Sequence, residues 1–527
     1  MFINARTVEP ESHMECDVCV VGAGGAGITV ARELAGTGLT VFLVESGGFD
    51  FDRASQDLYK ARSVGLPYPD LQRSRLRFFG GTTNTWEGNC SPLDPIDFEK
   101  RAEIEHSGWP FDRQHLDPFY ERAISYCQLD RESFELDYWS KLLNRTPFPL
   151  DPARVVTKIK QTSPVHFGAA YREDLKSAEN TTVLLHANLV NIETSPDGNL
   201  VNKVHIGVLE GPRFSIGLRY LVLAMGGIEN ARILLTSNGV HANGIGNQND
   251  LVGRFFMEHS MMEGGAIFFG ESRPDLSLYL NRPPAEEQYG SYLSVAEKAL
   301  RKEGLTNIRA PFRPVTRYYL SDGIDSSHQV LDDLERGDFP DDLDVHVANI
   351  VKDFDMVLEG VSRKAFGRSI DDSSDDHYGY VFDTMVELTP NPDSRVTLTE
   401  ERDALGTPRV RLDWRVCGRD RENLWRCYEI IGEEIGRAGL GRVRVFRERE
   451  HRIWASQMGR PYHHMGTTRA HRNPKDGVVN EHMQVHGVPN LFLAGSSVFP
   501  TGGHVPPTFT IVALAIRLAD HMKSLTG

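Results

Sequence analysis

The sequence contains few cysteines, no long apolar run and no excess of positive charge. Six cysteines are scattered over 527 residues, and the one close pair, Cys16 and Cys19, lies in a run that alternates into a buried strand. No second pair supports a zinc or redox motif, so we interpret both as thiols of the core and expect no metal site. This sparse use of cysteine favours a reduced, cytoplasmic enzyme.

The chain also lacks segments that would direct it to a membrane or to nucleic acid. No stretch is apolar and long enough to cross a bilayer, and residues 1–15 contain acids but no apolar core of a secretory signal. With 58 Lys and Arg against 73 Asp and Glu, the net charge is −15, which disfavours nucleic acid and anionic membranes as partners. The acidity mildly favours neutral or cationic substrates, although solubility also accounts for it.

The strongest local pattern is CDVCVVGAGGAGITVARELAGTGLTVFLVESGG, over residues 16–48. A β-branched strand, a glycine motif, a helical pattern and a second strand follow one another at residues 18–21, 22–27, 28–34 and 40–44. Gly22 allows a tight turn, Gly24 lets backbone N–H groups approach a pyrophosphate, and Gly27 lets the helix pack on the strand. Glu45 ends the second strand, where a carboxylate can accept hydrogen bonds from a ribose. The pattern predicts a dinucleotide-binding fold.

Further segments bear on whether the dinucleotide is NAD(P) or FAD. In three segments a strand or loop ends at small residues. They are RLRFFGGTTNTWEGN at residues 75–89, RYLVLAMGGIENARILLTSNG at 219–239 and HGVPNLFLAGSSVFPTGG at 486–503. Several strands or loops that end at small residues on one sheet suit a large, extended cofactor better than a nicotinamide nucleotide. A length of 527 residues favours two domains.

Together with NPDSRVTL (391–398) and HHMGTTR (463–469), these segments resemble the glucose–methanol–choline (GMC) oxidoreductases, FAD enzymes that oxidise alcohols. The resemblance is closest to the bacterial sugar and polyol branch, which is similar to pyranose oxidases. It implies an α/β FAD-binding Rossmann-like domain interleaved with an α+β substrate domain built on an antiparallel sheet. The expected division is a tail at 1–15, an FAD domain from 16–100, 181–258 and 456–527, and a substrate domain from 101–180 and 259–455.

The resemblance also implies the cofactor contacts. The ADP-binding motif corresponds to Gly22, Gly24, Gly27 and Glu45. The loop that covers the flavin corresponds to Gly80, Gly81, Thr83, Asn84 and Asn89. The strand end beside the pyrophosphate corresponds to Ala494 and Gly495. Some sugar-oxidising relatives bond the flavin covalently to a histidine of the covering loop. Thr85 occupies that position, and a threonine hydroxyl is a poor nucleophile, so we expect non-covalent FAD. Cys90 lies outside the aligned loop and is expected to be a packing thiol.

His463 matches the catalytic histidine of the family in the pattern His-x-x-Gly-Thr. Oxidation of an alcohol by hydride transfer to flavin N5 requires removal of the hydroxyl proton, and a neutral imidazole does this well. A buried structural histidine is the alternative for this residue. We expect His464 to point the other way and to be structural, as we do His259, for which a substrate contact is the alternative.

The turn before the last helix departs from the family pattern. Relatives place a second His or Asn there, and the sugar branch ends the turn in Asn-Pro-Thr; here the Asn position is Pro506. Proline has no side-chain donor or acceptor. Three outcomes remain open: His504 substitutes for the missing group, His463 acts alone, or the protein has been diverted to other chemistry.

The resemblance implies FAD-dependent oxidation of a hydroxyl group of a sugar, glycoside or cyclitol, with oxygen or another electron acceptor. A redox-neutral, lyase-like flavoprotein of the same fold is the alternative because of Pro506. In the middle of the chain we expect an acidic, solvated loop over residues 332–344, an amphipathic helix over 345–366 and an exposed loop at SIDDSSDD (369–376).

Overall fold

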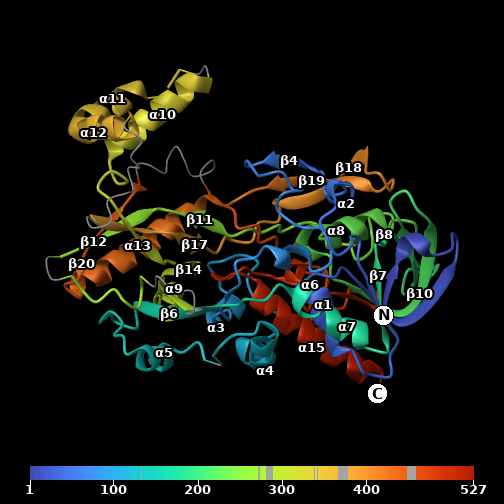
Figure 1. The fold of residues 1–527 in the computed structure, drawn as a ribbon. Helices are drawn as coiled ribbons and strands as arrows, with labels where there is room; N and C mark the ends of the chain where they lie inside the picture. Colours follow the sequence, from blue (N-terminus) through green and yellow to red (C-terminus); the bar gives the residue numbers. More distant parts are fainter. Residues whose placement is uncertain are drawn as a thin grey trace.

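The fold was analysed in a computed structural model of the chain (Figure 1). It describes residues 1–131, 133–270, 273–280, 289–336, 339–340, 342–365, 378–447 and 458–526.

The largest sheet has the strand order β1-β7-β3-β2-β10-β9-β8, and β21 pairs with β10. Its parallel centre consists of β2 (His13–Val21), β3 (Val41–Val44), β7 (Thr181–Leu185), β10 (Arg213–Leu223) and β21 (Leu491–Leu493). The antiparallel strands β8 (Asn188–Thr194) and β9 (Val201–Gly207) extend one edge. Strands from three distant parts of the chain thus share one sheet, as the interleaved division predicts.

Helix α1 (Gly25–Glu33) follows β2 directly and contacts α15 (Thr508–Thr526), which is buried along most of its length. Helix α8 (Gly226–Thr236) follows β10 in the same way. In each of these two crossings, buried apolar strand residues are followed within three positions by a glycine: Gly22 after β2, and Gly226, the first residue of α8, after β10. The strand–glycine–helix prediction is confirmed there, with the helix at 25–33 rather than at 28–34.

Two expected boundaries differ from the structure. Residues 1–15 are not a tail: β1 (Phe2–Asn4) pairs in parallel with β7, and β2 already begins at His13. Residues 101–180 do not belong only to the substrate side, because α4 (Arg113–Tyr126) lies against α15. Tyr120 and Thr510 hydrogen-bond there at 2.8 Å, so the last helix is held from both parts.

The substrate side is built from several small antiparallel sheets rather than one. Their orders are β11-β17-β14, β15-β16-β12-β20 and β13-β6-β5. The bounds are β5 (Asn89–Cys90), β6 (Val155–Thr162), β11 (Ser260–Met262), β12 (Gly265–Phe269), β13 (Tyr289–Val295), β14 (Ile308–Arg309), β15 (Phe312–Val315), β16 (Gly379–Phe382), β17 (Thr384–Val386) and β20 (Gly441–Val445). Helix α13 (Gly418–Arg437) contacts β13 and β20. A further sheet joins β18 (Arg395–Arg402), β19 (Pro408–Trp414) and β4 (Arg62–Gly65).

The middle of the chain corrects the prediction for residues 332–366. The acidic stretch is helical up to residue 336, as the end of α10 (Asp322–Arg336), and the next helix is divided into α11 (Leu343–Lys352) and α12 (Phe354–Ala365). These three helices project from the body (Figure 1), and Val351, Phe354 and Val361 are exposed. The helical period predicted for residues 345–366 is therefore confirmed, but several apolar side chains of these helices are exposed. The loop at 369–376 lies outside the described residues.

Within the described parts of the chain, no helix combines the length and apolar character needed to span a bilayer.

Candidate active site

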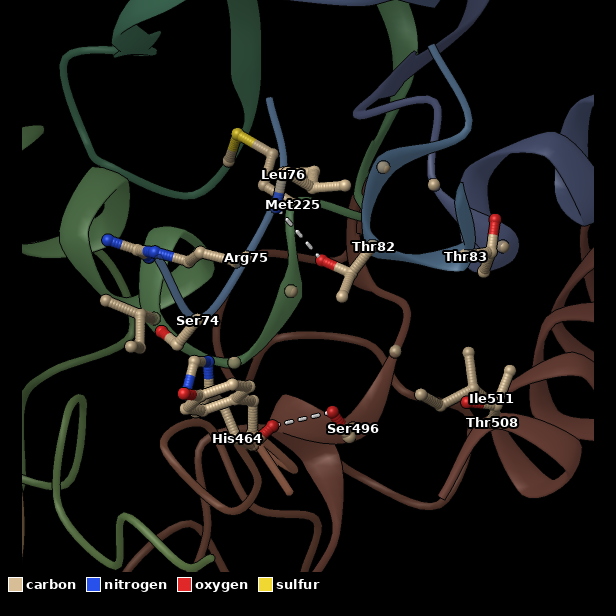
Figure 2. Close-up of a pocket in the computed structure, with 18 of the residues that line it drawn as sticks. Ser74, Arg75, Leu76, Thr82, Thr83, Met225, His464, Ser496, Thr508 and Ile511 are labelled. Carbon is tan, nitrogen blue, oxygen red and sulfur yellow. Dashed lines mark hydrogen bonds between the residues drawn. The ribbon is translucent and has the colours of Figure 1, made fainter. Parts of the chain in front are cut away.

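A cavity of about 830 Å³ lies where the loops after β2, β10 and β21 face β14 and β17. Gly24, Gly226 and Gly495 line it, one from each loop, and a Cβ added at any of them would meet nothing within 4 Å. Their missing side chains therefore leave room beside the backbone for a ligand. Figure 2 shows other lining residues, among them Ser74, Arg75, Leu76, Thr82, Thr83, Met225, His464, Ser496, Thr508 and Ile511.

The first glycine motif has the geometry that a dinucleotide needs. Gly22 has a φ of +101°, which favours glycine, and Gly24 precedes the first turn of α1. A Cβ at Gly27 would stand 1.8 Å from the carbonyl oxygen of Gly22, so only glycine lets the helix pack this closely. Gly27 itself is not part of the cavity wall; its role is to seat the helix whose N-terminus faces the cavity.

Glu45 is buried at the end of β3 and lines the cavity. Its carboxylate accepts hydrogen bonds from Ala23 N at 2.9 Å and Gly47 N at 2.8 Å. These amides hold the carboxylate in place beside the glycine motif. A carboxylate has acceptor positions beyond these two, so hydrogen bonds from a ribose remain feasible.

The covering loop forms a 3₁₀ turn, Gly81–Asn84, above Gly24. Gly81, Thr83, Asn89 and Gly495 lie in the cavity wall, whereas the side chain of Asn84 turns back to donate to Phe79 O at 3.0 Å. Gly80, with a φ of +98°, and Ala494 stand behind the wall. These residues shape the site through the backbone rather than by direct contact.

A charged network, absent from the predictions, also lines the cavity. Glu229 lies 3.0 Å from Arg75 and 3.1 Å from Arg232, and Arg232 also contacts Asp403 at 2.6 Å. Burial alone would raise the pKa of Glu229, but Arg232, Arg75 and Arg77 lower it to about 2. The same cavity wall therefore includes this network, the three glycine loops and His463.

His463 lies in the cavity wall and is held by His259, a residue that we expected to be structural. The two Nδ1 atoms are 2.8 Å apart, and the Nε2 atom of His259 lies 2.9 Å from the carbonyl oxygen of Gly503. A carbonyl oxygen only accepts, so the neutral His259 carries its hydrogen on Nε2 and accepts at Nδ1. His463 therefore donates from Nδ1, and its own Nε2 retains a lone pair.

Electrostatics keep both imidazoles neutral. Burial lowers the pKa of His463 well below its usual range, and His259, His464 and Arg309 act in the same direction. Burial also lowers the pKa of His259 to about 4. A pair of neutral imidazoles is the state in which one can donate to the other.

The backbone around His463 is fixed by a buried carboxylate. Glu258 accepts from the backbone N–H of His463 at 2.6 Å and from the hydroxyl of Tyr68 at 2.6 Å. Burial raises the pKa of Glu258 to about 7 despite these bonds. Tyr462, just before His463, has a φ of +63°, a conformation that side chains rarely adopt. His464 faces Tyr68, with Nε2 2.8 Å from its hydroxyl, consistent with a structural role.

His504 does not reach the cavity. Its ring is fully buried, and its Nδ1 lies 3.0 Å from the amide nitrogen of Asn307 and 3.5 Å from Asp97. Its Nε2 lies 3.3 Å from the hydroxyl of Tyr292. Pro506, the position expected to carry a polar group, does line the cavity. The two prolines therefore stiffen a turn that directs His504 away from His463, into the acidic group formed by Asp94 and Asp97.

Comparisons with known proteins agree with the fold and the cavity. Residues 17–236 match the model of FAD-dependent oxidoreductases, and residues 390–515 match the model of GMC oxidoreductases. The 2-methyl-1,2-propanediol dehydrogenase of Mycolicibacterium austroafricanum is 23% identical over 97% of this chain and 95% of its own. The 6'''-hydroxyparomomycin C oxidase of Streptomyces lividus is 23% identical over 96% and 92%.

Among solved structures, pyridoxine 4-oxidase from Mesorbium loti superposes with a TM-score of 0.59 at 15% identity, covering 97% of this chain and 99% of that one. The fold, the glycine loops and the cavity define an FAD-dependent oxidoreductase that acts on alcohol groups. Residues 390–515 add the second identification: this part of the chain is a GMC oxidoreductase domain. The predicted fold class, cofactor and family are confirmed.

Proposed function

We propose that this protein oxidises a hydroxyl group of a sugar, glycoside or cyclitol to a carbonyl group, with His463 as the general base and non-covalently bound FAD. The observation that carries the proposal is the 2.8 Å contact between His259 and His463. It assigns the lone pair of His463 to Nε2, the ring nitrogen for which no hydrogen-bond partner is found among the described residues. That nitrogen is free to take the proton of a substrate hydroxyl.

The residues present fit FAD. Three cavity glycines leave space beside the backbone, α1 directs its N-terminus at the cavity, and Glu45 stands at the position for a ribose. When bound, FAD supplies the hydride acceptor. The protein binds and orients the alcohol, removes its hydroxyl proton at His463 Nε2 and keeps His463 neutral through burial.

Two observations support the choice of substrate. Relatives that align along nearly the whole chain are named for oxidation of a diol and of an aminoglycoside, and part of the chain is 37% identical to the C-glycoside 3-oxidase of Arthrobacter globiformis over 22% of its length. The cavity also lies beside His463 rather than ending at the cofactor loops. The lyase-like alternative rested on the missing side chain at Pro506; in our proposal His259 supplies the partner of the base from another strand end.

Non-covalent binding is supported by the two side chains nearest the attachment position. Thr85 lines the cavity, and Cys90 is fully buried with a thiol whose pKa burial raises well above its usual range. Such a thiol is a poor nucleophile. We expect acid precipitation to release all yellow colour into the filtrate; colour retained by the protein would contradict this part of the proposal.

Anaerobic mixing of the holoenzyme with alcohols tests the reaction itself. The panel should contain simple glycosides, aminocyclitols, polyols and aryl alcohols, followed by aerobic assays with oxygen and with an artificial acceptor. At least one hydroxyl compound is expected to bleach the flavin absorbance and yield a carbonyl product. If a compound binds and is converted while the absorbance stays unchanged, the chemistry is redox-neutral and the proposal is wrong.

A further inference from the structure

A buried arginine faces the same cavity and forms no ion pair with any of the described residues. Arg309 ends the short strand β14, opposite Met385 of β17, and lies in the cavity wall together with His463. Its side chain is 8% exposed, its Nε has no hydrogen-bond partner, and no carboxylate of the described residues forms an ion pair with it. The ring of Tyr292 lies 5.4 Å from its guanidinium carbon. A cation desolvated in this way is costly unless something compensates it.

Lys160 is a second cation in the same wall. It extends from β6, donates a hydrogen bond from Nζ to Asn89 Oδ1 and also lacks an ion pair among the described residues. Burial, with the charge of Arg309 acting in the same direction, lowers the pKa of this amine to about 8. The two positive groups are therefore close enough to repel each other across the cavity wall.

The acidic groups in this wall do not neutralise the pair by contact. Glu87 is exposed and accepts from Asn89 Nδ2 at 2.9 Å, and it influences Lys160 and Arg309 only at longer range. Burial raises the pKa of Asp383, and Glu263 acts in the same direction, whereas Arg313 and Arg309 act against it. Neither acid forms an ion pair with either cation.

We propose that Arg309 and Lys160 form a subsite for an anionic oxygen group of the substrate, a carboxylate or a phosphate, so that the enzyme acts on a hydroxyl group of an acidic sugar or polyol. This inference rests on the proposed function. A guanidinium matches both anions with paired N–H donors, and an ammonium adds a point charge.

Such a substrate would also assist its own oxidation. Arg309 is one of the groups that lower the pKa of His463. An anion seated on Arg309 offsets that field, which makes His463 Nε2 more basic at the moment when the substrate hydroxyl is beside it. Neutral alcohols leave the field in place, so they should be slower as well as more weakly bound.

The test compares glucose, glucuronate and glucose 6-phosphate as probes of the holoenzyme at constant ionic strength. Binding is followed by flavin absorbance and by thermal shift, and reduction by anaerobic stopped flow. We expect at least one acidic probe to bind ten-fold or more tightly than glucose, and the comparison of the two acidic probes identifies carboxylate or phosphate. Equal binding of all three probes would overturn the inference.

Variants locate the effect. Arg309→Met should abolish the preference for the acidic probe, and Arg309→Lys should restore part of it. Arg309→Met should also be at least as thermally stable as the wild type, because it removes an uncompensated buried cation. Lys160→Met gives an independent measurement if Arg309→Met does not fold. The control is Arg411→Met, an exposed strand arginine outside the cavity, which should keep the preference.

The outcomes separate this inference from the proposed function. Flavin reduction by neutral alcohols with no preference for acidic probes leaves the oxidation intact and removes the anion subsite. If Arg309→Met slows neutral and acidic alcohols equally and shifts the flavin reduction potential, Arg309 acts on the cofactor and the subsite is wrong. If no alcohol reduces the flavin but an acidic probe binds through Arg309, the subsite stands and the oxidation fails.

Discussion

His259 and His463 are joined through their Nδ1 atoms at 2.8 Å, although 204 residues separate them in the chain. The carbonyl of Gly503 holds the other nitrogen of His259, so a single hydrogen-bond direction runs from His463 to His259 to the backbone. This arrangement leaves only Nε2 of His463 as a base. It also places a hydrogen-bond partner beside the proposed base, although Pro506 occupies the position where relatives carry one.

Replacement of the proposed base should stop chemistry without emptying the site. His463→Ala is expected to keep its FAD and to reduce it about 10²–10⁴-fold more slowly, the usual contribution of a positioned general base. Stopped-flow reduction under anaerobic conditions measures this. His471→Ala, on the same segment but outside the cavity, is the control and should reduce at the wild-type rate. An unchanged rate in His463→Ala would remove this residue from the mechanism.

The acid limb of the pH profile should lie below the normal range for histidine. A general base works in its neutral form, which is lost as the pH falls through its pKa. Because burial, His259, His464 and Arg309 lower the pKa of His463, kcat/KM for a neutral alcohol should stay level from pH 7 to below pH 6.5. The measurement is kcat/KM between pH 4.5 and 8. A decline centred at or above pH 6.5 would contradict the electrostatic account.

The role of His259 as a positioning residue can be separated from a packing role. His259→Leu removes the acceptor and should lower kcat by about 10–100-fold, because His463 then populates the tautomer with hydrogen on Nε2. His259→Asn can accept from His463 and should recover part of the rate. If both variants have equal stability and equal rates, the tautomer argument fails; the pH profile of each variant provides the second readout.

His504 should affect stability more than chemistry. His504→Ala removes one buried partner from each of Asp94, Asp97 and Asn307, which we expect to cost about 1–3 kcal/mol of unfolding free energy. Flavin reduction per bound FAD should stay within a few-fold of the wild type. The pair of measurements is thermal or denaturant unfolding and anaerobic reduction. A loss as large as that in His463→Ala would restore His504 to the active site.

Glu45 should control the occupancy of FAD rather than its reactivity. Glu45→Ala loses the charged acceptor, and each hydrogen bond to a charged group contributes about 1.5–3 kcal/mol. The variant is expected to purify with substoichiometric FAD and to recover activity when FAD is added. Glu45→Gln keeps one acceptor oxygen, so its FAD content should lie between that of the wild type and that of Glu45→Ala. Full FAD content in Glu45→Ala would exclude Glu45 as a ribose ligand.

The sequence alone determined the parts of this protein that depend on neighbouring residues. Gly22 allows a tight turn, Gly24 a close approach of the backbone to a pyrophosphate, and Gly27 a close contact between helix and strand. All three lie within six positions, so the dinucleotide fold could be predicted from them. The match of His463 to its motif was equally local. The helical period was also correct for α11 and α12, although the end of α10 was expected to be a loop. A period does not say which face another element covers, and Val351, Phe354 and Val361 are exposed.

Only the tertiary structure decided which side chains meet. His259, Arg309 and Lys160 come from separate strands or strand ends, and no local pattern distinguishes a cavity-facing charge from a solvated one. His504 shows the same limit: two prolines restrict its turn, but its direction follows from distant partners, Asn307 and Tyr292, that hold its ring. Local sterics fix backbone conformation, whereas hydrogen bonds and buried charges between distant segments fix the site.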